Sequence, residues 1–135
     1  MVFEGKILYR GVDLFDKVEG YKTSDKKIRF TLDGCSLIKY DDEEYNKVLA
    51  SKFVPKFFTE VDVKRLNLNT NYEIPILHLD GTLIDSNEVA NGSEVMVACK
   101  VTDDGRIYPK AIKVTKLKQK NDTNFDLGII AELFE

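Results

Sequence analysis

Apolar and polar residues alternate most regularly between positions 93 and 102. This period of two places successive side chains on opposite faces and predicts a half-buried β-strand. Asp104-Gly105 follows, and such a pair favours a tight hairpin turn because glycine adopts positive φ values without strain. Residues 106–116 again carry β-branched and apolar side chains, so we expect them to return as the second arm of a hairpin. The apolar positions of the first arm are Val95, Val97, Cys99 and Val101.

Shorter alternations elsewhere predict further strands. Asp33-Gly34 closes the second of them, and residues 37–40 continue it across a hairpin. Pro75 places the last one at a sheet edge or a strand start, because proline cannot donate a backbone hydrogen bond. The expected strands cover the stretches 1–10, 26–32, 57–68 and 74–79, with further turns at Asp80-Gly81 and Asn91-Gly92.

One helix is expected between residues 41 and 55. Asp41 or Asp42 can cap its first turn, and Pro55 stops it. Glu43 and Glu44 suit the positive N-terminal end of a helix, so we interpret this acidic cluster as a helix start rather than a metal site. The apolar face of the helix would hold Tyr45, Val48, Leu49 and Phe53.

Short strands, frequent turns and a single helix predict an all-β fold. A small OB-fold-like five-stranded barrel with one short helix fits the number of elements best. A split barrel or a small sandwich would produce nearly the same pattern. The 135 residues suit one domain.

Charge divides the chain into a body and a tail. Residues 1–120 contain all 20 lysines and arginines and have a net charge of +1. Residues 121–135 contain four of the 23 acidic residues and no base. We therefore expect a nucleic-acid-binding domain over 1–120 and an acidic-hydrophobic C-terminal tail over 121–135.

The sequence gives little support to an enzyme, a metal site or a bound cofactor. It has no glycine-rich phosphate loop after a strand, and its single histidine, His78, lies in an alternating stretch. Cys35 and Cys99 cannot build a zinc site with one histidine, and we expect two reduced thiols. No apolar run approaches the length of a membrane span, and charges interrupt the N-terminal residues early. We therefore expect no membrane contact and a cytoplasmic location.

Basic and aromatic residues occur together in three places. Ammonium and guanidinium groups neutralise phosphates, and aromatic rings stack on unpaired bases, so such sets are typical of single-stranded nucleic-acid binding. The alternative is that lysines on an outer strand face serve solubility and protect a sheet edge. The densest set lies on the return arm and consists of Arg106, Tyr108, Lys110 and Lys113; a second comprises Tyr21, Lys26, Lys27 and Arg29, and a third includes Lys64 and Arg65.

The tail combines acidic and large apolar side chains. It could dock on the basic groove of its own domain, present a short peptide to a partner protein, or form a last helix against the barrel end. The side chains expected to contact a partner are Phe125, Leu133, Phe134 and Glu135.

Residues 74–117 resemble the OB-fold single-stranded-DNA-binding proteins, particularly those encoded by bacteriophages. The likeness lies in IPILHLDGTLIDSNEVANGSEVMVACKVTDDGRIYPKAIKVTKL, where a strand, a DG turn, an NGS entry, a long strand and a basic-aromatic return arm follow one another. The acidic tail ending in Leu133-Phe134-Glu135 adds to it, although the chain has no tryptophan and the tail has no run of aspartates. The resemblance implies a groove that binds single strands and a tail tip that competes for the groove and recruits replication proteins.

The sequence therefore predicts sequence-tolerant single-stranded-DNA binding in phage DNA replication, recombination or repair, in the host cytoplasm. The alternative is a protein-interaction module, such as a viral factor that binds a host protein through residues 121–135. An exposed edge strand could also pair two copies in a homodimer.

Overall fold

The computed structural model describes residues 1–9, 28–70, 72, 74–85 and 88–118. Within these residues the chain forms six strands and two short helices in one sheet-based domain. The elements are β1 (Val2–Tyr9), β2 (Ile28–Lys39), α1 (Asp42–Ala50), α2 (Lys56–Thr59), β3 (Arg65–Thr70), β4 (Ile76–Leu77), β5 (Glu94–Val101) and β6 (Ile107–Lys116).

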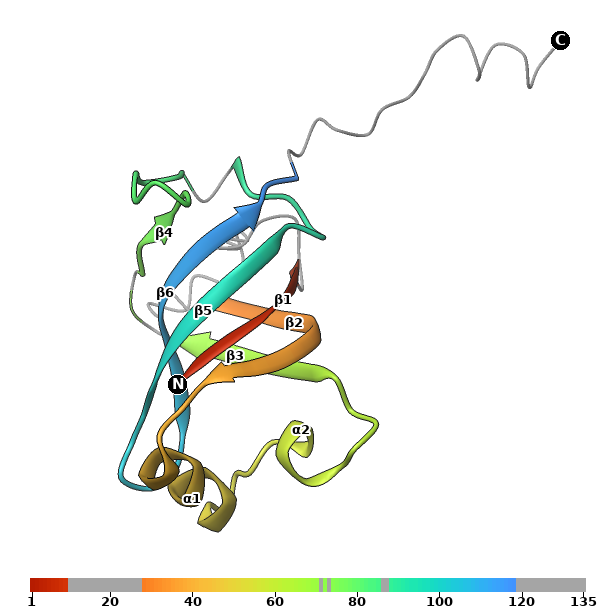
Figure 1. The fold of residues 1–135 in the computed structure, drawn as a ribbon, viewed down its shortest axis with the longest axis vertical. Helices are drawn as coiled ribbons and strands as arrows, with labels where there is room; N and C mark the ends of the chain where they lie inside the picture. The colour runs from red at the N-terminus through yellow and green to blue at the C-terminus, as the bar shows by residue number, and fades with distance from the viewer. Residues whose placement is uncertain (10–27, 71, 73, 86–87, 119–135) are drawn as a thin grey trace, which may run out of the picture.

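The six strands form a single sheet in the order β3-β2-β1-β5-β6-β4. All neighbours are antiparallel except β4, which pairs in parallel with the middle of β6. The sheet curls into a half-barrel, and contacts between β3 and β6 bring its two sides together (Figure 1). This architecture confirms the expected small all-β, OB-like fold, although the sheet has six strands and not five. The strand predicted over 74–79 forms only at residues 76–77, at the sheet edge.

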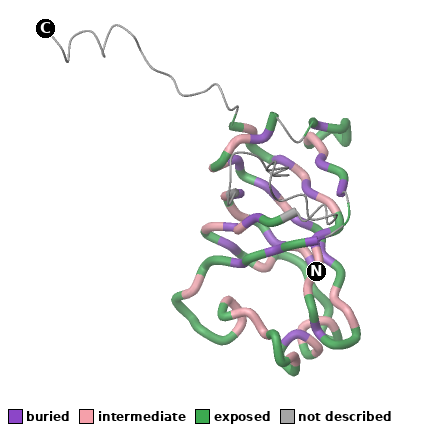
Figure 2. The backbone as a smooth tube through the Cα atoms, turned by 180° about the vertical axis from the view of Figure 1, so that it is seen from behind, coloured by how far each residue is buried: buried purple, intermediate pink, exposed green. Residues whose placement is uncertain are grey.

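The core lies inside the curl of the sheet. Burial alternates along β3 and β5, as the period of two in the sequence predicts. Buried residues follow the strands, whereas α1 and the turns near it are mostly exposed or intermediate (Figure 2). The largest fully buried side chains are Phe3, Phe30, Ile7, Leu32, Leu66 and Ile112.

The predicted hairpin at Asp33-Gly34 is wrong, because β2 continues through this pair as one strand of 12 residues. The register against β1 moves from Glu4 opposite Ser36 to Lys6 opposite Asp33, which leaves one extra residue on β2. Gly34 has φ = 60°, the conformation that a glycine-containing β-bulge requires. The glycine does adopt a positive φ value, but the strand bends instead of reversing.

The strand predicted over 57–68 is correct only from Arg65 onward. Pro55 precedes α2, a single helical turn, and does not end α1, which has already ended at Ala50. From this turn the rings of Phe57 and Phe58 both pack edge-on against Phe3, at centroid distances of 6.0 and 6.2 Å. A helical turn can direct two adjacent rings at one core residue, which a strand cannot do.

Helix α1 begins as predicted and ends earlier than predicted. Asp41 caps it, accepting a hydrogen bond of 2.7 Å from the Glu44 backbone amide. Val48 is buried, but Leu49 is exposed, and the helix ends before Ser51. A carboxylate oxygen of Glu44 also lies 3.0 Å from the buried α-amino nitrogen of Met1. The acidic cluster therefore stabilises the start of the helix and forms an ion pair with the N-terminus. Neither helix in the described part of the chain has the length and apolar character needed to span a membrane.

The β5–β6 hairpin forms as predicted, and its tip contacts the last turn of α1 (Figure 1). The backbone amide of Thr102 donates to the Arg106 carbonyl at 2.9 Å, and Gly105 takes φ = 80°. A Cβ atom on Gly105 would lie 2.1 Å from the backbone oxygen of Lys47. Glycine is therefore required at this position both for the turn and for the close approach of the hairpin to α1.

Candidate nucleic-acid interface

The outer face of β5 and β6 carries the basic and aromatic residues of the return arm. On β5, Val95, Val97 and Cys99 point into the core, so the side chains between them point outward. Tyr108 of β6 pairs with Lys100, and Lys113 pairs with Met96. Because Lys100 and Met96 belong to the outward set, Tyr108 and Lys113 share that face. The two pairs lie four positions apart on β5, a span of about 13 Å along the strand.

Lys110 lies at an irregularity of the same hairpin. Ala98 pairs with Ala111 and Cys99 with Pro109, so Lys110 is the extra residue of a β-bulge on β6. Its side chain is exposed. The bulge therefore places this lysine between Tyr108 and Lys113 without pairing it across the ladder.

Arg106 lies at the tip of the hairpin in a cluster of polar and aromatic groups. Its Nε atom is 3.1 Å from a carboxylate oxygen of Asp104. A hydrogen bond with the neighbouring Tyr108 hydroxyl, and then the charge of Asp104, raise the pKa of Arg106. The guanidinium carbon also lies 4.4 Å from the centroid of the Phe53 ring, in cation–π contact.

Asp104 keeps its negative charge beside this arginine. A hydrogen bond from the Thr102 hydroxyl, followed by the charge of Arg106, holds the pKa of Asp104 below its usual value. The charge of Arg106 is therefore partly neutralised within the protein. Lys100, Lys110 and Lys113, by contrast, make no ion pair with any residue that the structure describes. These three lysines supply the uncompensated positive charge of the outer face.

The other two basic sets do not join this surface. Arg29 lies exposed on β2 opposite Asn69, and two strands, β1 and β5, separate β2 from β6. Three strand spacings correspond to about 14 Å, and the curl of the sheet turns these outer faces apart. Arg65 pairs with Asp33 at 3.0 Å, and Lys64 is exposed just before β3. Tyr21, Lys26 and Lys27 lie outside the described residues.

Two residues of this surface, Lys100 and Phe53, were not among the site residues predicted from the sequence. Lys100 lies on the first arm of the hairpin and follows the same outward alternation as Ala98, so the period of two was sufficient to include it. Phe53 fits the apolar face of the predicted helix and therefore resembled a core residue. It lies beyond the end of α1 and is 62% exposed.

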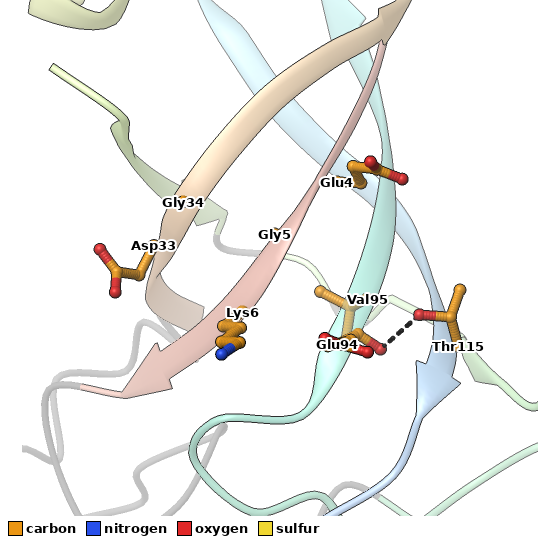
Figure 3. Close-up of a pocket in the computed structure, with 8 residues that line it drawn as sticks. All are labelled: Glu4, Gly5, Lys6, Asp33, Gly34, Glu94, Val95 and Thr115. Atoms are coloured by element: carbon orange, nitrogen blue, oxygen red, sulfur yellow. Dashed lines mark hydrogen bonds between the residues drawn. The ribbon is translucent and has the colours of Figure 1, made fainter. Parts of the chain in front are cut away.

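An acidic depression borders the basic surface on the side of β1 (Figure 3). Glu4, Asp33 and Glu94 contribute carboxylates from three strands, with Lys6 between them. The Thr115 hydroxyl donates to the Glu94 carbonyl at 3.0 Å and closes one side of it. Carboxylates repel a polyanion, so the basic surface is limited to the part of β5 and β6 between the Met96–Lys113 pair and the hairpin tip.

The described residues contain no group of three or more His, Cys, Asp or Glu side chains arranged to hold a metal ion. Cys35 and Cys99 are buried free thiols, and burial raises the pKa of each to about 12. Phe125, Leu133, Phe134 and Glu135 of the tail fall in the part of the chain that is not described.

Comparisons of the chain with protein-family models, with curated proteins and with solved structures give no match. The likeness to phage single-stranded-DNA-binding proteins therefore stays a prediction from the sequence.

Proposed function

We propose that this protein binds single-stranded nucleic acid along the outer face of the β5–β6 hairpin, without strong sequence preference. The observation that carries the proposal is the gathering on one strand face of Tyr108 and three lysines that make no ion pair with another described residue. The lysines neutralise phosphates, and the rings contact base faces that every nucleotide has. The OB-like fold is compatible with this use, because open barrels of this kind present a strand face to oligonucleotides.

Single-stranded DNA in phage replication, recombination or repair is the setting that the sequence resemblance favours. Phosphates and base faces are common to DNA and RNA, so the cluster itself supports single strands as a class. The cytoplasm of a bacterial host is the matching location. A partner role for the tail stays a separate prediction from the sequence.

Removal of the three lysine charges tests the proposal. In the triple variant Lys100→Gln, Lys110→Gln and Lys113→Gln, we expect affinity for a fluorescent thymidine oligomer to fall at least about tenfold at low salt. The slope of log K against log salt should become less steep by about 0.7 for each phosphate contact removed. Fluorescence anisotropy titrations at several salt concentrations measure both quantities.

The matched control is the triple variant Lys6→Gln, Lys56→Gln and Lys64→Gln. It removes the same charge from exposed positions outside the outer face of β5 and β6. Its affinity should stay within about threefold of the parent protein, because only long-range attraction changes. Equal losses in the two triple variants would show that net charge, and not this surface, determines binding.

A further inference from the structure

Phe53 is an exposed ring that the fold holds in a fixed place. It follows α1 in the segment that leads to α2, and 62% of its surface is accessible. The Arg106 guanidinium covers one face of the ring at 4.4 Å from the centroid. The accessible part must therefore include the opposite face and the ring edge.

The backbone around Phe53 is fixed by hydrogen bonds at the end of α1. The Ser51 amide donates to the Val48 carbonyl at 3.1 Å, and the Phe53 amide donates to the Ser51 hydroxyl at 3.0 Å. A side-chain acceptor of this kind defines the chain direction after a helix. The position of the ring is thus set by two consecutive contacts rather than by core packing.

The hairpin tip is tied to the same helix end. Gly105 packs against the backbone of Lys47, and the Lys47 ammonium lies 3.6 Å from a carboxylate oxygen of Asp103. Arg106, next in the chain, is itself oriented by Asp104 and Tyr108. The contacts of the hairpin tip with α1 therefore hold the Arg106 guanidinium over one face of the Phe53 ring.

We propose that Phe53 is a base-stacking residue, whose free face receives one unpaired base of the bound strand. The inference rests on the proposed function: the phosphates lie along Lys100, Lys110 and Lys113, and the strand reaches Phe53 at the hairpin tip. A base in a duplex already has both faces covered by its neighbours, so this contact selects single strands. Arg106 is the positioning residue for the ring.

An abasic oligomer separates stacking from phosphate binding. It has the same phosphodiester backbone as a thymidine oligomer of equal length but carries no bases. We expect Phe53→Ala to weaken thymidine-oligomer binding by about 5- to 150-fold, the range measured for one base–aromatic stack. Binding of the abasic oligomer should be unchanged. Phe53→Tyr keeps the ring and should retain affinity for the thymidine oligomer.

Tyr72→Ala is the matched control. Tyr72 is 75% exposed and follows β3 at the end of the sheet opposite to α1, so its loss should leave both affinities unchanged. Circular dichroism melting of each variant checks that the fold is retained.

The outcomes distinguish this inference from the proposed function. If the parent protein binds neither oligomer, the proposed function is rejected together with the stacking contact. If it binds the thymidine oligomer and Phe53→Ala binds equally well, only the stacking role is overturned. Equal losses of Phe53→Ala on thymidine and abasic oligomers, or a loss in Phe53→Tyr as large as in Phe53→Ala, would also overturn it.

Discussion

At the scale of single residues, burial and local hydrogen bonds decide which side chains are available for chemistry. Asp41 could be predicted as a helix cap because capping depends on a few neighbouring residues. Phe53 could not be placed from its spacing, since a continued α1 would put it on the buried face. Only the end of the helix before Ser51 and the approach of Arg106 from a distant part of the chain give this ring its position.

The two cysteines provide a residue-scale prediction. Both thiols should react very slowly with a disulfide reagent at pH 8 in the folded protein and rapidly in denaturant. Burial raises the pKa of Cys35 and Cys99 to about 12, from an ordinary value of 9.0, and the thiolate is the reactive form. The pKa of each thiol is higher in the folded protein than in the unfolded chain. The free energy of unfolding should therefore keep its full value below about pH 9 and fall as the pH rises toward 12.

Absorbance assays with and without guanidinium chloride measure the reactivity. Urea unfolding from pH 8 to pH 11 measures the loss of stability, and Cys35→Ala is the control, since it should show a shallower fall with pH. Stoichiometric reaction of native thiols within the mixing time at pH 8 would contradict the burial of both residues.

At the scale of elements, the hairpin of β5 and β6 was predictable because two independent local signals agree. The alternation places one face outward, and Asp104-Gly105 supplies the turn. Asp33-Gly34 carries the same local signal and yet forms a bulge. The difference arises from pairing with β1, which a local pattern does not contain. Likewise, the alternation around Phe57 is compatible with a strand, and only the position of Phe3 makes a helical turn favourable.

Two glycines with similar backbone angles test the docking of the hairpin on α1. Gly81 has φ = 87° and open space where a Cβ would lie, whereas Gly105 has φ = 80° and would place a Cβ against Lys47. Gly81→Ala should therefore lower the free energy of unfolding by about 1–2 kcal/mol from backbone strain alone. Gly105→Ala should cost about 1–3 kcal/mol more, because the tip must also move away from the helix.

Urea denaturation of the two variants and the parent protein gives these differences directly. Equal destabilisation by the two substitutions would mean that the hairpin tip is not held against α1. In that case nothing would hold the Arg106 guanidinium in contact with the Phe53 ring.

At the scale of the whole molecule, fold class and charge distribution were accessible from the sequence, but the shape of the basic surface was not. The number and spacing of strands led to the OB-like fold, which the curled sheet confirms. The three basic sets are distinct regions in the sequence, and nothing in it indicates that β1 and β5 would lie between Arg29 and Lys113. The acidic depression beside β5 is likewise assembled from three strands distant in sequence.

One compact cluster at the β5–β6 hairpin is a stronger candidate for a binding surface than basic residues spread over the whole sheet. Phe53 and Arg106 are far apart in the chain and meet only because the β5–β6 hairpin is long enough to reach the end of α1. The exposed lysines that we propose bind phosphates and an exposed ring then lie between Lys113 and the hairpin tip. Basic residues scattered one by one over the whole sheet would not form a continuous surface along which a flexible polyanion could bind.

The most direct test of the central claim is the salt dependence of thymidine-oligomer binding by the unaltered protein, measured by fluorescence anisotropy between about 50 and 300 mM salt. The arrangement of Lys100, Lys110 and Lys113 predicts measurable binding at the lowest salt concentration. It also predicts that log K falls against log salt with a slope of about −2 or steeper, from about 0.7 for each phosphate contact. An affinity that does not change over this range, or no binding at the lowest salt concentration, would contradict a phosphate-binding surface on the β5–β6 hairpin.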